Sequence, residues 1–212
     1  MLSVCETFSS IQGESTHAGR RCFFIRLSGC SLRCSYCDTG YAREGGTSMS
    51  VEQLVEAAKA SALGLAEITG GEPMEQAETP ELCRGLLAAG LEVLLETNGA
   101  WPLDAVPVGV ARIIDCKLPS SGMSEHNCEH NYEILRPGDE IKFVTGSRED
   151  FDFAVSTVKK FSLAEKPCEL LVSPVWGKVD FRELAEWVMS CGLPFRMQLQ
   201  MHKLIWGDRR GV

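Results

Sequence analysis

Three cysteines, Cys30, Cys34 and Cys37, stand close together in the pattern C-x-x-x-C-x-x-C. Three thiolates at this spacing can hold three corners of a four-iron, four-sulfur cluster from one loop, because thiolates are the usual ligands of such clusters. The fourth iron then has no protein ligand. S-adenosylmethionine (SAM) can chelate such an open iron through its amino and carboxylate groups, and an electron from the cluster can then cleave its sulfonium.

The same cysteines could instead form a structural zinc site or pack in a core. Zinc requires four ligands; His17 could supply one, but the sequence has no second C-x-x-C pair. Core packing is disfavoured because the three cysteines fall within eight residues, among Gly29, Ser31, Arg33 and Asp38. The spacing therefore favours an iron–sulfur cluster over both alternatives.

Other cysteines of the chain are scattered, and the plainest interpretation is that they are small buried residues. Cys83, Cys168 and Cys191 fall in expected helices or strands and are predicted to be core residues. The run His126-x-Cys128-x-His130 has the look of a metal site, but it offers only three ligands in a segment without clear periodicity.

Alternating strands and helices must position the cysteine loop. Strands are expected at residues 22–27, 65–69, 91–96, 111–115, 139–144, 168–173 and 194–201, and helices at residues 50–62, 80–89, 148–161 and 181–190. Residues 6–14 are expected to precede the first strand, and residues 118–138 show no clear period. This alternation predicts a parallel α/β sheet or barrel.

The unusual loops all follow the carboxyl ends of expected strands. They are the cysteine loop, Gly70-Gly71-Glu72, Thr97-Asn98 and Lys117. Ligands bind at the carboxyl ends of the strands in both open α/β sheets and α/β barrels, so these loops are expected to face one pocket.

Length and composition set the broad class. The chain has 212 residues and is expected to form one domain, with a formal net charge of −8 that argues against a nucleic-acid partner. No apolar run is long enough to cross a membrane, and residues 1–10 do not resemble a signal peptide. A cytoplasmic protein is expected.

Two motifs resemble the radical SAM superfamily. The cysteine pattern has an aromatic residue, Tyr36, before its last cysteine, and T-G-G-E-P at residues 69–73 resembles the superfamily's GGE motif. Two glycines let a backbone approach a ligand closely, and Glu72 can accept hydrogen bonds from a cationic amino group.

Further motifs narrow the resemblance. They are E-T-F-S-S-I-Q-G-E at residues 6–14, F-F-I-R-L-S-G-C at 23–30, C-D-T at 37–39 and Q-L-Q-M-H-K-L-I-W at 198–206. Together they resemble the 7-carboxy-7-deazaguanine synthase family of the queuosine (7-deazapurine) pathway, over nearly the whole chain. The resemblance implies an incomplete, TIM-like α/β barrel of parallel strands, with residues 1–212 forming a single radical SAM domain.

The family resemblance implies a carbon–nitrogen lyase that converts 6-carboxy-5,6,7,8-tetrahydropterin to 7-carboxy-7-deazaguanine and releases ammonia. A 5′-deoxyadenosyl radical removes hydrogen from the pterin, the ring contracts and SAM is regenerated, so the cofactor rather than a side chain performs the chemistry. The implied cofactors are a [4Fe–4S] cluster, SAM and Mg²⁺. The implied partners are the small-molecule pterin, an electron donor of the flavodoxin or ferredoxin type, and a second copy of the chain in a homodimer.

The resemblance also implies site residues, although no side chain is assigned as catalytic. Substrate binding is expected from Ile11, Gln12, Gly13, Glu14, Arg26, Thr69 and His202, and SAM binding from Tyr36, Cys37, Asp38, Gly71, Glu72, Asn98, Lys117 and Ser173. Thr39 is the implied Mg²⁺ ligand. The family has S-P-K where this chain has D-C-K at residues 115–117, a departure that concerns Lys117.

Several of these residues have a structural alternative. Gln12 and Glu14 could pair with the polar edge of a pterin or form an ordinary turn. Arg26, in an apolar strand, could bind a substrate carboxylate or form a structural ion pair. Thr39 could cap a helix instead of binding Mg²⁺, and His202 could be a satisfied strand histidine.

Two other functions remain open from the sequence. A radical SAM activase that makes a glycyl radical on a partner protein would share the cluster motif, but the motifs at residues 11–14 and 198–206 argue against it. A non-catalytic zinc-binding module would use the cysteines alone, and metal analysis of protein purified without oxygen would separate it from a cluster protein.

Overall fold

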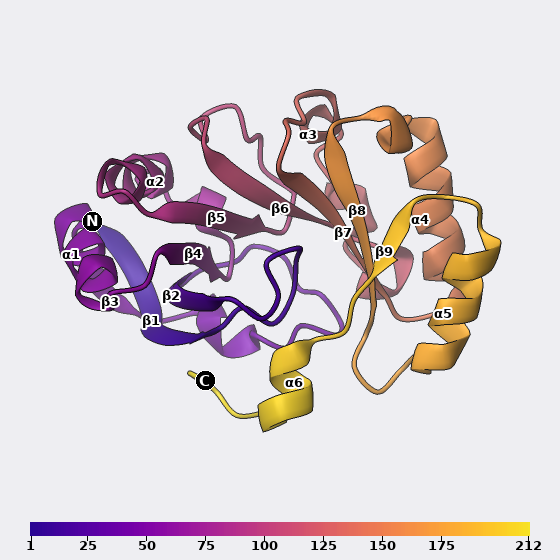
Figure 1. Cartoon of the computed structure of the whole chain (residues 1–212), viewed down its shortest axis with the longest axis horizontal. Coiled ribbons are helices and arrows are strands. Elements are labelled where there is room, and N and C mark those ends of the chain that lie inside the picture. Colours follow the sequence, from indigo (N-terminus) through magenta and orange to yellow (C-terminus); the bar gives the residue numbers. More distant parts are fainter.

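A sheet of nine strands forms the body of the molecule in a computed structural model that describes residues 1–212 (Figure 1). The strands are β1 (Leu2–Ile11), β2 (Arg21–Leu27), β3 (Thr47–Met49), β4 (Leu65–Gly70), β5 (Glu92–Thr97), β6 (Val110–Cys116), β7 (Asp139–Thr145), β8 (Cys168–Pro174) and β9 (Phe195–Met197). Their order is β3-β1-β2-β4-β5-β6-β7-β8-β9, and the two edges do not pair, so the barrel is incomplete. From β2 to β9 all pairs are parallel, whereas β1 is antiparallel to both of its neighbours.

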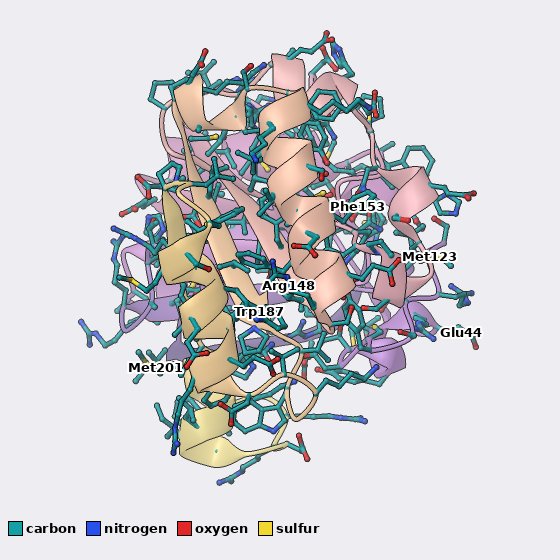
Figure 2. The ribbon with its side chains drawn as sticks, turned by 90° about the vertical axis from the view of Figure 1, so that its right-hand side faces the viewer. Glu44, Met123, Arg148, Phe153, Trp187 and Met201 are labelled. Atoms are coloured by element: carbon teal, nitrogen blue, oxygen red, sulfur yellow. The ribbon has the colours of Figure 1, made fainter.

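Helices cover the outer, convex face of the sheet, except for the last one, which lies on the open side of the barrel (Figure 1). They are α1 (Val51–Ala60), α2 (Thr79–Ala88), α3 (His130–Glu133), α4 (Arg148–Lys160), α5 (Phe181–Ser190) and α6 (Met201–Trp206). Helices α4 and α5 lie side by side, and the Arg148 guanidinium carbon lies 5.5 Å from the Trp187 ring centroid between them (Figure 2). None of these helices combines the length and the apolar character that a membrane crossing requires.

The two faces of the strands carry different chemistry. Successive side chains of a strand point to opposite faces, and the outward set joins the helices in a core of 32 buried residues. The inward set forms a small apolar cluster at the base of the barrel, made of Cys22, Phe24, Leu65, Leu94 and Ile113. Nearer the carboxyl ends, the inward positions of β4, β5 and β7 carry Glu67, Glu96 and Lys142, so the barrel interior becomes charged there.

Local sequence explains where the longer helices begin. Ser50 caps α1 in a complete capping box, in which its side chain accepts from Gln53 N while the Gln53 side chain accepts from the Ser50 backbone. Ser147 caps α4 in the same position, accepting from Asp150 N. Each helix is thereby fixed directly after the strand-end loop that precedes it.

The predicted strands from 22–27 to 168–173 and all four predicted helices are confirmed to within two residues at each end. The prediction that residues 6–14 precede the first strand is wrong, because Leu2–Ile11 is itself a strand. Its inward positions include the polar residues Glu6, opposite Arg26, and Ser10, opposite Cys22, so its apolar alternation is weak. Strand β3 was not predicted either, being three residues long.

The last expected strand, residues 194–201, is wrong at its carboxyl end. The strand stops at Met197, and α6 begins at Met201, whose backbone N–H donates to Gly13 O at 2.9 Å. This contact turns the chain away from the sheet edge and across the opening of the barrel. The unperiodic residues 118–138 contain two short 3₁₀ helices, Pro119–Ser121 and Ser124–His126, and then α3.

Candidate active site

A cavity of about 710 Å³ lies inside the barrel, open at the carboxyl ends of the parallel strands. Nearly all the side chains predicted for cluster, SAM, magnesium and substrate line it, although they come from distant parts of the sequence. They are Ile11, Gln12, Gly13, Glu14, Arg26, Cys30, Cys34, Tyr36, Cys37, Asp38, Thr39, Thr69, Gly71, Asn98, Lys117 and His202. Glu72 and Ser173 do not line it.

The three clustered cysteines lie on the loop that follows β2, at the rim of this cavity. Burial raises the pKa of the Cys30 and Cys34 thiols, because it disfavours the thiolate. Lys117 opposes this shift at Cys34, and Asn98 Nδ2 donates to Cys30 Sγ at 3.8 Å. Sheltered thiols beside a cation and an amide donor suit an iron–sulfur cluster, whose irons would stabilise the thiolate form.

The arrangement of the cysteines does not suit a zinc ion. No group of three or more His, Cys, Asp or Glu side chains is arranged to hold one. The possible site at His126, Cys128 and His130 is therefore not formed; His130 Nε2 instead lies 3.0 Å from Asp104 Oδ1. Three cysteines spread around a cubane need not converge on one point, so this finding disfavours zinc without disfavouring a cluster.

The G-G-E motif holds three loops together at the rim. A Cβ on Gly71 would lie 1.9 Å from Gly29 O, so only glycine allows the end of β4 to pack against the cysteine loop. Glu72 N donates to the same carbonyl at 2.6 Å. The glycine is thus needed for contact with the cluster loop, a reason that the sequence did not reveal.

Glu72 itself lies behind the cavity wall and is fully buried. Its carboxylate accepts from Met74 N at 2.9 Å, Thr97 Oγ1 at 2.7 Å and Asn98 N at 2.6 Å. Burial raises its pKa to about 7 despite these donors. These bonds fix the backbone of Asn98 beside Cys30, and the expected contact of Glu72 with SAM stays a prediction. Ser173 is likewise buried, on an inward position of β8.

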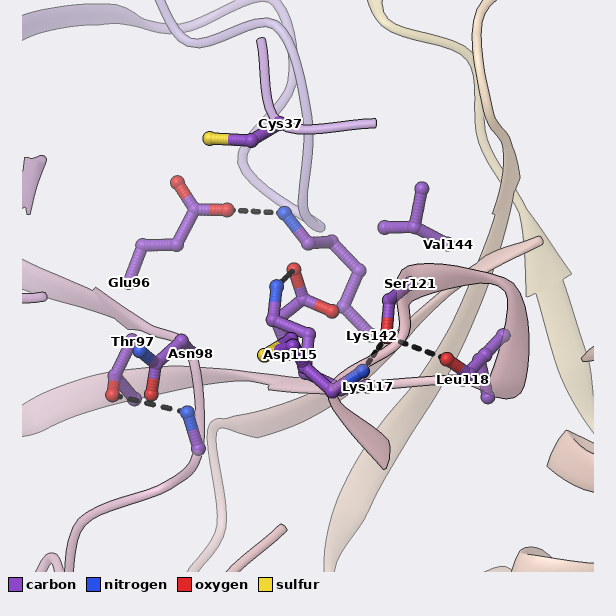
Figure 3. Close-up of polar contacts among 12 residues, drawn as sticks. Cys37, Glu96, Thr97, Asn98, Asp115, Lys117, Leu118, Ser121, Lys142 and Val144 are labelled. Atoms are coloured by element: carbon purple, nitrogen blue, oxygen red, sulfur yellow. Dashed lines mark hydrogen bonds and ion pairs between the residues drawn. The ribbon is translucent and has the colours of Figure 1, made fainter. Parts of the chain in front are cut away.

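Lys117 and Asp115 form an ion pair beside the cysteine loop (Figure 3). Lys117 Nζ donates to Asp115 Oδ2 at 2.8 Å, while Asp115 Oδ1 is buried and has no hydrogen-bond partner. An unpaired buried carboxylate oxygen at a cavity wall is available to a ligand hydroxyl or amine. The D-C-K sequence, where the family has S-P-K, therefore still presents polar groups to the cavity.

Opposite the cysteines, the loop after β1 forms the floor of the cavity. Gln12 Nε2 donates to Glu67 Oε2 at 2.7 Å, and Gln12 Oε1 accepts from Glu14 N at 2.5 Å. The Glu14 carboxylate accepts from Lys142 Nζ at 3.0 Å and from Gln200 Nε2 at 2.9 Å. These bonds make the loop part of the barrel interior and not an exposed turn.

Lys142 also pairs with Glu96, so one buried ammonium holds two carboxylates (Figure 3). Thr69 Oγ1 donates to Glu96 Oε2 at 3.2 Å. Attraction to both carboxylates raises the pKa of Lys142 against the opposing effect of burial. The lysine is therefore charged, and it sets the positions of both carboxylates.

Arg26 forms a structural ion pair in this structure. Its Nε donates to Glu6 Oε1 at 2.9 Å, and Tyr41 OH donates to the same oxygen at 3.0 Å. The Arg26 side chain still borders the cavity. Its guanidinium NH₂ groups form no hydrogen bond with the protein, so the expected contact with a substrate carboxylate stays a prediction.

Helix α6 closes one side of the cavity. His202 lies on this helix, so the alternative that it is a histidine within a strand is wrong. A Cβ on Gly13 would lie 2.5 Å from His202 Nδ1, so the helix packs directly on the β1 loop. Lys203 Nζ pairs with Asp38 at 2.9 Å and joins α6 to the cysteine loop as well.

Sequence reasoning missed Glu67 and Lys142, and it did not foresee that residues 207–212 line the cavity. A signal for the first two was present, since each interrupts an apolar strand: L-A-E-I-T-G for Glu67 and D-E-I-K-F-V for Lys142. A charged residue inside a strand is rarely buried without a partner. The partners, however, come from other strands.

Comparison with known proteins agrees with this geometry. Residues 24–118 match the model of the radical SAM superfamily. A 7-carboxy-7-deazaguanine synthase of Chlorobaculum tepidum is 44% identical over all of this chain and 97% of its own length. A synthase of the same name from Koribacter versatilis is 39% identical over the full length of both chains.

Solved structures agree on the fold. QueE from Escherichia coli superposes with a TM-score of 0.74 at 22% identity, covering 95% of this chain and 94% of its own. Streptococcus suis SuiB superposes with a TM-score of 0.62 at 13% identity, covering 82% of this chain and 48% of its own. Neither synthase relative is a glycyl-radical activase, so that alternative is not favoured. The chain belongs to the 7-carboxy-7-deazaguanine synthase family of radical SAM enzymes.

Proposed function

We propose that this chain, as one radical SAM domain, converts 6-carboxy-5,6,7,8-tetrahydropterin to 7-carboxy-7-deazaguanine and ammonia in the cavity described above. The observation that carries the proposal is that three cysteines and a charged, hydrogen-bonding floor face the same cavity of about 710 Å³. A volume of this size accommodates a cofactor together with a small substrate. We infer the activity from the chain's membership of the 7-carboxy-7-deazaguanine synthase family.

The family uses a [4Fe–4S] cluster and SAM, and the donor set of Cys30, Cys34 and Cys37 fits the cluster. When bound, the two supply the one-electron chemistry that removes a hydrogen atom from the substrate. Asn98 and Lys117 face the cysteines and would hold polar groups of SAM, while Gly71 keeps the rim closed against the cysteine loop. Tyr36, whose OH donates to Val144 O at 3.2 Å, borders the cavity, and we expect it to contact the adenine of SAM.

The pterin is proposed to lie on the floor of the cavity. Its amide-like edge carries N–H donors and a carbonyl, which complement the Glu14 carboxylate and backbone groups at Ile11 and Gly13. The side chain of Gln12 is already used by Glu67 and Glu14 N, so it shapes the loop more than it contacts a ligand. The substrate carboxylate is proposed to reach the free NH₂ groups of Arg26.

We further propose that Mg²⁺ binds beside the substrate, with Thr39 as its protein ligand. Thr39 precedes a short 3₁₀ helix but forms no side-chain cap hydrogen bond, and it lines the cavity. Its hydroxyl lies 3.8 Å from Cys37 Sγ and keeps a lone pair for a cation that otherwise takes water and substrate oxygens. Thr39→Val is expected to lower the rate at limiting Mg²⁺ more than at excess Mg²⁺, and Thr39→Ser is expected to restore it.

The remaining partners follow from the chemistry and the family. We propose a reductant of the flavodoxin or ferredoxin type, a homodimer and a cytoplasmic location, where such reductants and reduced thiols are maintained. Light scattering of the purified protein would test the dimer. Reduction of the cluster by each class of donor in place of dithionite would test the electron source.

An anaerobic assay with the carboxytetrahydropterin, SAM and a reductant tests the main proposal. The expected result is a product with the absorption of a deazaguanine, together with ammonia and no net consumption of SAM. Cleavage of SAM without that product would contradict the proposal and would favour an activase. A preparation with one zinc and no iron would contradict both.

A further inference from the structure

Glu67 is a buried acid without a cation of its own. It lies in the middle of β4 with 1% of its surface exposed, and its side chain points into the barrel beside the floor loop. Its carboxyl accepts from Gln12 Nε2 at 2.7 Å, and the carboxyl of Glu96, on the neighbouring strand β5, lies beside it. A buried carboxyl with these two neighbours needs an explanation, because one neighbour is a second carboxylate.

The surroundings of Glu67 do not supply a counter-charge. The titratable groups that interact with it are Glu14 from the floor loop, Cys22 from β2 and Glu96 from β5, and the cations nearest this group are Arg26 from β2 and Lys142 from β7. Of the two cations, Arg26 pairs with Glu6, and Lys142 already pairs with both Glu14 and Glu96. A third carboxylate charge in this interior would be uncompensated.

A single proton on Glu67 removes this uncompensated negative charge. Two adjacent carboxyl groups in a buried site do not both ionise, and Glu96, bound by Lys142 and Thr69, is the one that keeps its charge. Burial and the neighbouring Glu96 accordingly raise the pKa of Glu67, whereas Lys142 lowers that of Glu96 against burial. Glu67 then donates to Glu96 with its hydroxyl and accepts from Gln12 with its other oxygen.

We propose that Glu67 is a positioning residue for substrate binding: a neutral carboxylic acid that bridges Glu96 to the Gln12 amide and so fixes the floor segment from Gln12 to Glu14. The inference rests on the proposed function, because it concerns the site at which the pterin would bind. It adds to the site a residue that acts through Gln12.

The hydrogen bonds of Gln12 explain how a change at Glu67 would alter substrate binding. Its Nε2 donates to Glu67, which turns its Oε1 toward Glu14 N and sets the shape of the loop. Glu14 is thereby presented to the cavity and to Lys142. Without an acceptor at residue 67, the Gln12 amide would be buried with an unsatisfied donor, and the loop would rearrange to satisfy it.

Three variants test the proposal: Glu67→Gln, Glu67→Leu and the control Glu169→Gln, which changes an exposed strand glutamate of β8. Glutamine can donate to Glu96 and accept from Gln12, so Glu67→Gln is expected to keep KM for the pterin within about twofold. Glu67→Leu can do neither and is expected to raise KM by about tenfold or more. Iron content should match wild type in all three variants, which shows that the cluster is intact, and SAM cleavage by dithionite without substrate should be unchanged in the control Glu169→Gln.

The pH profile separates a positioning acid from a merely structural side chain. The wild-type KM is expected to rise at alkaline pH as Glu67 ionises, and the Glu67→Gln profile is expected to lack this rise. The proposal is overturned if Glu67→Gln binds as poorly as Glu67→Leu, or if it keeps the alkaline rise. If Glu67→Leu does not fold, the Glu67→Gln profile still decides.

A second measurement is independent of the substrate. An acid with a raised pKa in the folded state loses stability as pH rises above its unfolded value, so Glu67→Gln should become more stable than wild type as pH increases. Absence of this trend contradicts the neutral acid even if turnover is normal. Its presence in a protein without pterin turnover would contradict the proposed substrate while leaving the neutral acid in place.

Discussion

Lys142 Nζ on β7 lies 3.0 Å from Glu14 Oε2, in the loop that follows β1. The two residues are 128 positions apart in the sequence and come from opposite sides of the incomplete barrel. The ion pair therefore crosses the barrel interior and anchors the floor loop to the sheet. It does so with a lysine whose side chain is only 6% exposed.

Replacement of this lysine is expected to damage both stability and binding. Lys142→Met would leave Glu14 and Glu96 buried near one another with no cation, and loss of one partner from a buried ion pair costs about 3 kcal/mol of the free energy of unfolding. We also expect KM for the pterin to rise at least tenfold, since Glu14 would move. Urea unfolding and steady-state kinetics would measure the two effects.

Lys160→Met is the matched control, since Lys160 pairs with Glu129 on the surface and both side chains are about 60% exposed. Such exposed pairs contribute little, so its unfolding free energy should change by less than about 1 kcal/mol. Equal losses in the two lysine variants would contradict the role given to Lys142.

The cluster ligands are expected to be distinguishable from the other cysteines by metal content. Cys34→Ala and Cys37→Ala should each lose most of the iron from a wild-type value of about four per chain, because only three thiolates hold the cluster. Cys128→Ala should retain it, since Cys128 does not line the cavity that the three ligands border. Iron analysis and the visible spectrum of anaerobic protein would check this; an intact cluster in Cys34→Ala would refute the assigned ligands.

Contact between the floor loop and α6 is expected to depend on a glycine. In Gly13→Ala the new methyl would lie 2.5 Å from His202 Nδ1 and 2.9 Å from His202 N, so the helix must shift. A shift of this kind in a substrate-positioning element is expected to raise KM by about tenfold. Gly64→Ala, where no atom lies within 4 Å of the added Cβ, is the control and should bind normally.

His17, in the loop between β1 and β2, is expected to make the free energy of unfolding depend on pH. Glu140, with a contribution from Glu92, raises the pKa of His17 although burial opposes the shift. This stabilisation is fully present below the unfolded pKa of about 6.5 and is lost as pH rises through the folded value. The difference in unfolding free energy between wild type and His17→Gln should therefore be larger at about pH 6 than at about pH 9.

Urea unfolding at the two pH values would measure this difference. Replacement of His126, which is exposed, serves as the reference variant. A wild-type advantage over His17→Gln that grows toward alkaline pH would show that the sign is reversed.

Much of this protein could be read from the sequence because the relevant signals are local. Cys30, Cys34 and Cys37 occupy one loop, so their spacing alone indicates a cluster with an open iron. The parallel strands and the capping box at Ser50 are likewise set by nearby residues. A loop after each parallel strand must reach the same edge of the sheet, which placed most of the candidate residues in one cavity before any coordinates were known.

Only the tertiary structure determined which buried carboxylates pair with which cation. The sequence shows Glu67, Glu96 and Lys142 as charged residues in apolar strands. Their pairing depends on the register of the strands and on the loop after β1, a strand that the sequence did not predict. The same holds for Glu72, which the motif suggested as a ligand contact and which the fold directs to Asn98. Hydrogen bonds between distant segments depend on distances of a few tenths of an ångström, and these are fixed only once the barrel has packed.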